Sequence, residues 1–429
     1  MKSMLLPLFS IVFVAPLIAQ DTLRISRDQA ETIFLQNNLL LISEQLQIEQ
    51  LKAEVIQAKL WPNPSFSINE VNLWATDKQT AGQEVSPPFW GNFGRNQQVG
   101  FEIEQLIQTS GKRKKRIALE QLEVYKAEQY FEELLRGLKL ELRNQLTALQ
   151  YTQYAIGVHK DLAASISKLT SAYKNQVEQS NISKSQYIRL KAQELEINKE
   201  ILALNTASRE IQTALKLLLR ADPRLTLSIT NDGFIRDASR YTSVFIDEVL
   251  ETAKQNRPDY KMALLEEEYS NKILAYEKAQ RTPDMTFGVN YDRNGNTMLD
   301  FVGFGLSFDL PFFNRNKGNI KKAEIGIAQA KVMTNQKVLS IENEILSAFA
   351  SLQQAQQFIS AIETDYESDL DKLLERYTQN FSTKNVSMLE YLDFLDAYLE
   401  NKKIILEAQK ELNQKTEEFI YTLAKDLYN

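Results

Sequence analysis

Hydrophobic residues recur at alternating three- and four-residue steps over long stretches of this chain. Between residues 112 and 178 there is no proline. The apolar positions there form a regular seam: Phe131, Leu135, Leu138, Leu142, Leu146 and Leu149. This spacing is typical of helices that pack as coiled coils. It predicts one helix of about 65 residues, on the order of 100 Å long. The same pattern predicts a second very long helix over residues 319–379 and a last helix with Ile405, Leu412 and Phe419 seven residues apart.

Four shorter segments alternate apolar and polar residues, which is the pattern of β-strands. They are residues 65–74, 99–107, 285–291 and 302–310, and each pair flanks a loop rich in Gly, Pro or Asn. The apolar positions of the second pair are Phe287, Val289, Tyr291, Val302, Phe304, Leu306 and Phe308. Strands of about nine to eleven residues with one apolar, aromatic-rich face fit a transmembrane β-barrel, and we expect these seven side chains to face lipid. An ordinary hairpin packed on a helix is the alternative.

The second half of the chain repeats the first. Residues 173–192 align without a gap with residues 377–396, and the shared positions are Tyr173/Tyr377, Asn181/Asn385, Ser183/Ser387 and Tyr187/Tyr391. Each half reads as helix, strand pair, very long helix, turn and long helix. A period of about 200 residues is too long for a solenoid unit and indicates an internal duplication. We predict a first repeat over residues 20–221 and a second over 222–429, with a short strand at 225–229 near the start of the second repeat.

Composition narrows the classes of function. The chain has 50 basic and 56 acidic residues, and neither half is basic, which argues against nucleic-acid binding. It has no cysteine, so disulfides, thiol catalysis and cysteine metal sites are excluded. We find no nucleophile–base pair, phosphate loop or cofactor motif, so we do not expect an enzyme.

The N-terminus reads as an export signal. Lys2 supplies a positive charge, residues 5–18 are apolar, and Ala19 is a small residue before the expected cleavage site. We therefore predict a signal peptide over residues 1–19. Its apolar run of about 14 residues is too short to span a bilayer, and no other run approaches about 20. If the protein is membrane-embedded, the strands must cross the membrane. Four strands cannot close a barrel, and small membrane barrels need about eight, so we predict cyclic association of several copies, of which three would supply twelve strands.

Taken together, these features resemble the TolC-type outer-membrane efflux family over essentially the whole mature chain. The basic start Ser110-Gly111-Lys112-Arg113 follows the second strand, and residues 314–318 follow the fourth. Tyr377, then Asn385-Val386-Ser387, then residues 392–397 resemble the tip turn and the D-x-L-D-A stretch of the inner helix. The phrase NVSMLEYLDFLDAY is most similar to the cation-efflux (CzcC-like) branch. Two departures are the absence of a lipidated cysteine and of the Tyr-x-x-Gly glycine, which Gln176 and Asn380 replace.

The resemblance implies a mainly α-helical protein with a membrane β-barrel portion. The trimer would form a twelve-stranded barrel in the outer membrane of a Gram-negative bacterium and an α-helical tunnel in the periplasm. It would be the passive exit duct of a tripartite efflux pump, coupled to an inner-membrane pump by a periplasmic adaptor, with metal cations as cargo. The same duct serving drugs or type I secretion is one alternative, and a soluble periplasmic coiled-coil adaptor or scaffold is another.

The resemblance also assigns candidate site residues. It places Asn181, Ser183, Asn385 and Ser387 in the tip turns. It makes Asp393 and Asp396, three apart on one helix face, a pore constriction of two stacked carboxylate rings. The first half has Arg189 and Ala192 at these positions, so the rings come from one half only. A solvated acidic face is the alternative.

Other residues are less informative. The basic run 112–116 fits either anchoring at lipid headgroups or a solvated helix start. Trp74 and Trp90 fit an aromatic girdle, and Trp61 fits core packing. His159, the one histidine, is isolated on a long helix, so we expect no metal site and no cofactor.

Overall fold

A computed structural model describes residues 22–72, 78, 98–230, 241, 245–293 and 300–424. The predicted signal peptide, Trp74 and Trp90 lie outside these residues. The chain forms two compact units. The hairpin unit comprises Met1–Leu39, Gly137–Phe245 and Leu346–Tyr421, and the strand unit comprises Leu40–Arg136, Ile246–Ile345 and Thr422–Asn429. Each unit therefore draws on both predicted repeats, whose boundaries stay a prediction.

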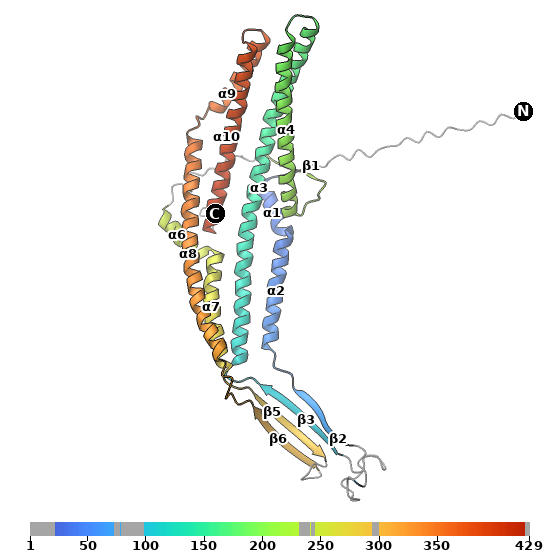
Figure 1. Ribbon diagram of the computed structural model, residues 1–429, viewed down its shortest axis with the longest axis vertical. Helices are drawn as coiled ribbons and strands as arrows, with labels where there is room; N and C mark the ends of the chain where they lie inside the picture. Colours follow the sequence, from blue (N-terminus) through green and yellow to red (C-terminus); the bar gives the residue numbers. More distant parts are fainter. Residues whose placement is uncertain are drawn as a thin grey trace, which may run out of the picture. The chain divides into compact units, whose positions relative to one another are not determined.

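The strand unit contains an antiparallel four-stranded sheet. Its strands are β2 (Ser65–Asn72), β3 (Gln98–Ile107), β5 (Met285–Arg293) and β6 (Asp300–Phe308), in the order β2-β3-β5-β6. This order brings the strand pairs of the two halves together, because β3 pairs with β5 along its length. The edges of the sheet are β2 and β6, and Figure 1 shows them on its two sides.

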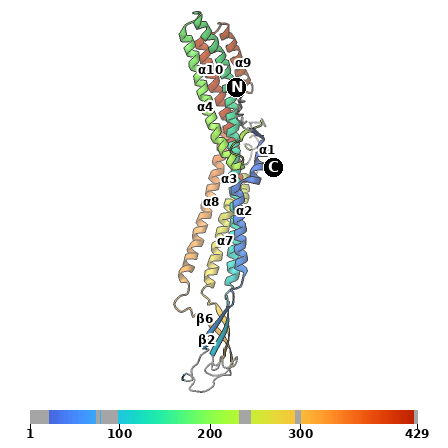
Figure 2. The ribbon, with the colours of Figure 1, turned by 90° about the vertical axis from the view of Figure 1, so that its right-hand side faces the viewer.

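The helices that adjoin the sheet strands in sequence are arranged in the same order as those strands, and the strand unit contains one further helix, α6. They are α2 (Leu39–Lys59), α3 (Lys112–Glu178), α6 (Ile246–Asn256), α7 (Pro258–Ala279) and α8 (Lys317–Ser360). Ile48 and Val55 of α2 pack on Val124 of α3. Lys126 of α3 binds Glu266 of α7 at 2.8 Å, and α7 accepts a hydrogen bond from α8. Hence α2 and α8 lie on opposite sides of α3 and α7, as Figures 1 and 2 both show.

The hairpin unit holds the remaining elements. They are β1 (Thr22–Ile25), α1 (Arg27–Asn37), the end of α3, α4 (Lys184–Leu219), β4 (Thr226–Ile229), α9 (Tyr366–Ser382) and α10 (Met388–Leu423). The hairpins α3–α4 and α9–α10 share one apolar core, in which Ile166 and Leu190 meet Tyr391 and Leu395. The short strands β1 and β4 pair in parallel.

Most predicted elements are found. The first long helix runs over Lys112–Glu178, 67 residues, and the short strand near residue 225 is β4. Pairing of β4 with β1 was not predicted, because four residues of strand 200 positions away give no local signal. Within the described residues, none of the helices is both long and apolar enough to cross a bilayer.

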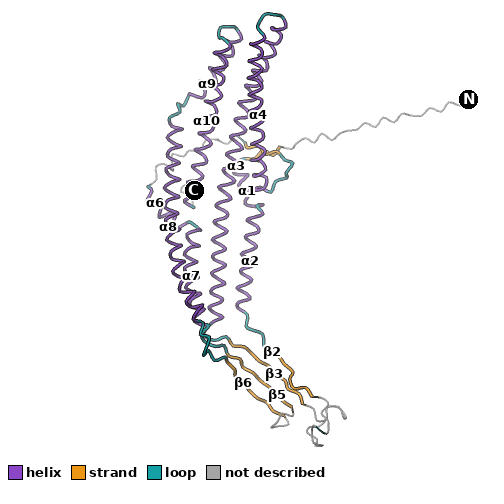
Figure 3. The backbone as a smooth tube through the Cα atoms, viewed as in Figure 1, coloured by secondary structure: helices purple, strands orange, loops and turns teal. Residues whose placement is uncertain are grey.

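Two expectations are wrong. The second long helix is not continuous: α8 ends at Ser360 and α9 begins at Tyr366, and Figure 3 shows a loop between them. The acidic residues Glu367 and Asp369 then favour a new helix N-terminus in the first turn of α9. Trp61 is not in a core. It follows α2, is 60 % exposed, and carries the Arg113 guanidinium 3.8 Å from its ring centroid.

Candidate functional site

The seven strand residues predicted to face lipid lie on one face of the sheet. The register sets Phe287 opposite Leu306, Val289 opposite Phe304, and Tyr291 opposite Val302. Side chains at directly opposite positions point to the same face. Phe304 is 75 % exposed, so nothing in the described part of the chain covers the centre of this face. Lipid contact itself stays a prediction.

The first strand pair extends the same apolar face. Phe66 lies opposite Ile103 and Ile68 opposite Phe101, while Phe101 lies opposite Tyr291 of the second pair. Phe101 stacks on both Phe66 and Tyr291, with ring centroids 6.1 and 6.3 Å apart. The opposite face is polar, with Glu102 beside Asn290 and Glu104 beside Gly288 in the register. The sheet is therefore apolar on one side and hydrophilic on the other across all four strands.

In the basic run at the start of α3, one residue is buried and ion-paired. Lys112 is buried, and its Nζ binds Asp284 Oδ1 at 2.8 Å. The same carboxylate oxygen accepts a hydrogen bond from the Thr109 backbone N–H at 2.9 Å. Asp284 precedes β5, so this ion pair joins the helix after β3 to the strand beside it. It also offsets positive charge at a helix N-terminus, which the helix dipole disfavours.

The two tip turns have the same backbone geometry. The N–H of Asn181 donates to Gln176 O, and the N–H of Asn385 donates to Asn380 O, both at 2.9 Å. The residues before the asparagines, Ser180 and Lys384, have φ of 60° and 64°. This pattern is a Schellman motif, which ends a helix with one left-handed residue. Since Gln176 and Asn380 supply only their carbonyl groups, the missing family glycine does not disturb the turn.

The helices after the two turns begin differently. The Ser387 hydroxyl accepts a hydrogen bond from the Glu390 N–H at 3.3 Å, and the Ser387 N–H donates to Glu390 Oε2 at 2.9 Å. This is a capping box. Ser183, the matching residue before α4, makes no capping hydrogen bond, and its Oγ lies 2.9 Å from Ser185 Oγ instead. The hydrogen bonds from Ser387 lower the pKa of Glu390.

Asp393 and Asp396 lie on α10, and both are exposed in the single chain. Asp396 Oδ1 accepts a hydrogen bond from Gln193 Nε2 of α4 at 2.9 Å, and Gln193 is buried. This contact ties the two hairpins together close to their tips. The structure thus places both aspartates on an exposed part of α10. The constriction itself stays a prediction.

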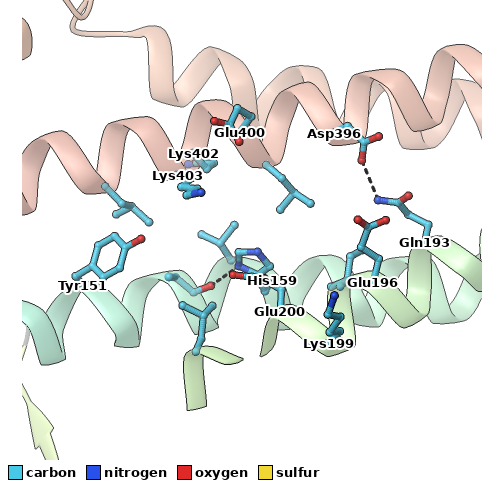
Figure 4. Close-up of a pocket in the computed structure, with 16 residues that line it drawn as sticks. Tyr151, His159, Gln193, Glu196, Lys199, Glu200, Asp396, Glu400, Lys402 and Lys403 are labelled. Carbon is cyan, nitrogen blue, oxygen red and sulfur yellow. Dashed lines mark hydrogen bonds between the residues drawn. The ribbon is translucent and has the colours of Figure 1, made fainter. Parts of the chain in front are cut away.

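A groove of about 370 Å³ lies beside Asp396 between α3, α4 and α10. Figure 4 shows charged side chains of both signs along it, including Glu196, Glu200 and Lys403. His159 lines it too, and His159 Nδ1 lies 2.8 Å from Ala155 O of its own helix. Among the residues that the structure describes, no three His, Asp or Glu side chains cluster closely enough to hold a metal. The groove is therefore lined by side chains of mixed charge.

A buried lysine holds α9 to α10, and sequence reasoning missed it. Lys402 is 6 % exposed, and its Nζ binds Glu367 and Asp371 of α9, each at 2.9 Å. The Tyr398 hydroxyl also donates to Asp371 at 2.9 Å. Burial first, and then this hydrogen bond to a carboxylate, raise the pKa of Tyr398. Lys402 shares the inner face of α10 with Tyr398 and Ile405. The signal in the sequence was this lysine at a position of α10 where the helical spacing predicts an apolar residue.

The structure defines a mainly helical protein in which a four-stranded sheet and two helical hairpins belong to separate units. Residues 249–420 match the family model described as outer membrane efflux protein. No curated protein matches the sequence. The matched segment lies within the second half of the chain.

Several solved channel structures have this fold. CusC, in a structure concerned with folding and transmembrane channel formation, has a TM-score of 0.70 and 17 % identity, over 94 % of this chain and 93 % of CusC. The outer membrane protein VceC of Vibrio cholerae has a TM-score of 0.68 and 16 % identity, over 93 % and 96 % of the two chains. The CmeC outer membrane channel of Campylobacter jejuni has a TM-score of 0.73 and 13 % identity, over 93 % and 85 %. At these identities the comparison establishes the fold.

Proposed function

We propose that this chain is an outer-membrane efflux channel of the family that residues 249–420 match. Three copies form a closed twelve-stranded barrel in the outer membrane and a helical tunnel in the periplasm. The channel is the passive exit duct of a tripartite pump and works with a periplasmic adaptor and an inner-membrane transporter. The predicted signal peptide over residues 1–19 directs export.

The observation that carries this proposal is the sheet of the strand unit. It has one continuous apolar face, one polar face and two open edges, β2 and β6. An open sheet edge leaves backbone N–H and C=O groups unpaired, which lipid does not tolerate. A single copy cannot remove its own edges, whereas β6 of one copy paired with β2 of the next closes a cylinder after three copies. An apolar outside and a polar lumen then follow from the register.

Membrane embedding is tested by a charge on the apolar face. Phe304→Arg should destabilise the assembled protein by about 2–4 kcal/mol if this position meets the bilayer midplane. Ser307→Arg, on the polar face of the same strand, is the matched control and should assemble normally. The measurements are the amount of protein left in outer membranes after carbonate washing and the fraction of detergent-resistant trimer. A soluble adaptor would leave the membrane fraction in the wash. Equal behaviour of the two variants would contradict lipid contact of Phe304, and damage by Ser307→Arg alone would mean that the opposite face meets the lipid.

We further propose that the cargo is a metal cation and that Asp393 and Asp396 form the constriction. The support is the phrase NVSMLEYLDFLDAY and the exposure of both carboxylates on one face of α10. Rings of carboxylates attract cations and therefore make a pore selective for them.

The constriction is tested by conductance. Asp393→Ala with Asp396→Ala should raise the single-channel conductance in planar bilayers and weaken the preference for cations. Asp393→Asn with Asp396→Asn is the control for size. It should lose cation preference and change conductance less, because it removes charge while keeping the side-chain volume. Unchanged conductance and selectivity in the alanine variant would remove both residues from the pore.

A further inference from the structure

A cavity of about 480 Å³ lies in the strand unit where the chain passes from β6 to α8. Its walls come from the end of α7 and from the segment after β6. Figure 3 shows the loops of this unit gathered at the junction of the sheet and the helices. Three basic residues, Lys278, Arg281 and Arg315, line the cavity together with Leu310 and Phe312, and none of its lining residues is acidic. The cavity is therefore suited to an anion with an apolar portion.

The three basic side chains lack an anionic partner in the described part of the chain. All three residues are exposed. Arg315 Nε donates a hydrogen bond to Pro311 O at 3.2 Å, which holds the guanidinium group and leaves its two terminal nitrogens without a partner among the described residues. Lys278 and Arg281 lie near the C-terminal end of α7, where the helix dipole favours positive charge. The dipole does not account for Arg315, which comes from the other segment.

Nearby carboxylates do not neutralise the cavity. Glu277 accepts a hydrogen bond from Asn316 Nδ2 at 2.6 Å, and Asp284 binds Lys112 at 2.8 Å. Asp309 is exposed and is not among the residues that line the cavity. The lining thus carries three positive charges that the described chain leaves unpaired.

The matching place in the first half of the chain is different. There Lys112 is buried and bound to Asp284. Arg113 lies over the Trp61 ring and donates a hydrogen bond to Lys59 O at 2.9 Å. These two basic residues after β3 are therefore used within the chain, whereas those of the cavity are left for a partner outside it.

Exposed aromatic side chains lie beside the basic ones. Phe312 is 67 % exposed, and Phe313, the next residue, is fully exposed. The segment directly follows Phe308, the last residue of the apolar face of β6. Aromatic and basic side chains together are typical of the level of lipid headgroups. If the strands cross the membrane, this segment lies at the headgroup level on the side where the helices begin.

We propose that the cavity binds the phosphate group of an anionic phospholipid in the periplasmic leaflet of the outer membrane. Lys278, Arg281 and Arg315 are the phosphate ligands, and Phe312 and Phe313 lie against the acyl chains. Arginine binds phosphate through two parallel N–H donors, and lysine adds a point charge. The exposed phenylalanines favour a lipid over free phosphate, because free phosphate offers them no apolar surface. This inference rests on the proposed membrane embedding and names a lipid that the embedded channel holds.

Native mass measurement of the detergent-purified, full-length protein tests the site. Phosphatidylglycerol and phosphatidylcholine with the same acyl chains are added separately, and the lipid retained per copy is measured. The natural protein should retain phosphatidylglycerol in preference to phosphatidylcholine. The combined variant Lys278→Gln, Arg281→Gln and Arg315→Gln should lower this retention by about tenfold or more, because each basic residue contributes to the binding of an anionic lipid.

A matched control removes the same charge from the first half. It combines Lys114→Gln, Lys115→Gln and Arg116→Gln, which lie beside a strand end but outside the cavity, and it should retain the lipid. The fraction of detergent-resistant trimer should be the same in all variants. If the combined cavity variant fails to assemble, Arg315→Gln alone replaces it and should lower retention about threefold.

Two further measurements separate a lipid from free phosphate. Phe312→Ser with Phe313→Ser should lower the retention of phosphatidylglycerol several-fold, and inorganic phosphate in about tenfold excess should not displace the lipid. Displacement by phosphate, or an unchanged phenylalanine variant, would overturn the lipid site.

The site and the proposed channel can fail separately. If the natural protein resists carbonate washing as a trimer but shows no preference for phosphatidylglycerol, the lipid site is wrong and the channel stands. Equal loss of lipid in the cavity variant and the first-half control leads to the same conclusion, since it would reflect general surface charge. If the natural protein is washed out of the membrane, both proposals are wrong.

Discussion

The two helical hairpins of the hairpin unit have the same turn and different surroundings. Both turns use a Schellman motif with one left-handed residue and the same pair of backbone hydrogen bonds. Their side chains have diverged, since Arg189 and Ala192 of α4 correspond to Asp393 and Asp396 of α10. Backbone hydrogen bonds survive almost any substitution at the positions that supply only carbonyl groups. The turns therefore keep the same geometry although their sequences differ, whereas the charges and packing of the two hairpins have diverged.

The hairpins also differ in how they join the rest of the chain. Helix α3 continues without a break into the first hairpin, while the second begins at α9 after the loop 361–365. In place of helix continuity, α9 is attached to α10 by side chains. These are the Lys402 pairs and the hydrogen bond from the Tyr366 hydroxyl to Asn401 Oδ1 at 2.8 Å. In the second hairpin, side-chain contacts thus replace the helix continuity that the first hairpin has.

The largest expected difference between the hairpins concerns the repeated tyrosine. Tyr391 is fully buried and stacked on Phe381 with ring centroids 4.4 Å apart, whereas Tyr187 is partly exposed. Tyr391→Ala should lower the free energy of opening of the second hairpin by about 3–5 kcal/mol, because it leaves a cavity in the shared core. Hydrogen exchange of peptides over residues 377–400 measures this. Tyr187→Ala is the matched control, and an equal loss there would mean that the two tyrosines are equivalent.

A smaller effect is expected from the buried lysine. Lys402→Met should weaken the α9–α10 contact by about 1.5–3 kcal/mol, because two charge-assisted hydrogen bonds are lost. Glu367 and Asp371 are half exposed and can be rehydrated, which favours the lower end. Hydrogen exchange in residues 366–382 should accelerate. The corresponding residue of the first hairpin, Asn198, bonds only its own helix, so Asn198→Met should change exchange in α3 and α4 little. Similar changes in both variants would contradict a clamp specific to the second hairpin.

The sequence predicts those features that depend on residues close together in the chain, and it fails for contacts between residues far apart in the chain. The limits of α3 follow from periodicity and the absence of proline, and the common face of the strands follows from alternation. The break before α9 has a local signal, the acidic run from Glu363 to Asp369. The helical spacing of apolar residues continues through this run, however, and so predicts one unbroken helix. The contacts of Gln193 with Asp396 and of Lys402 with Glu367 join helices that only folding brings together. The hydrophobic pattern of the sequence does not predict which residues make such contacts.

The smallest expected effect separates the two helix starts. Ser387→Ala should weaken the start of α10 by about 1 kcal/mol, the usual contribution of a serine N-cap. Ser183→Ala should change α4 by only a few tenths, because Ser183 makes no capping hydrogen bond. Hydrogen exchange at the first turn of each helix measures both effects. A loss of equal size at Ser183 would show that the two starts are capped alike.

The pH dependence of the same site sharpens the contrast. The folded hairpin lowers the pKa of Glu390 through its hydrogen bonds with Ser387, so folding favours the ionised carboxylate. The stabilisation is therefore complete above the pKa of an unfolded glutamate, about 4.3, and is lost as the pH falls through the lower pKa of the folded hairpin. Protection of the α10 start should thus decline as the pH falls below about 4.3 in the natural protein. In Ser387→Ala this decline should become smaller, because the contribution of the serine hydroxyl to the pKa shift is lost while the backbone N–H of residue 387 remains. The start of α4 has Gln186 at the position that corresponds to Glu390, so it should show no such decline in either protein.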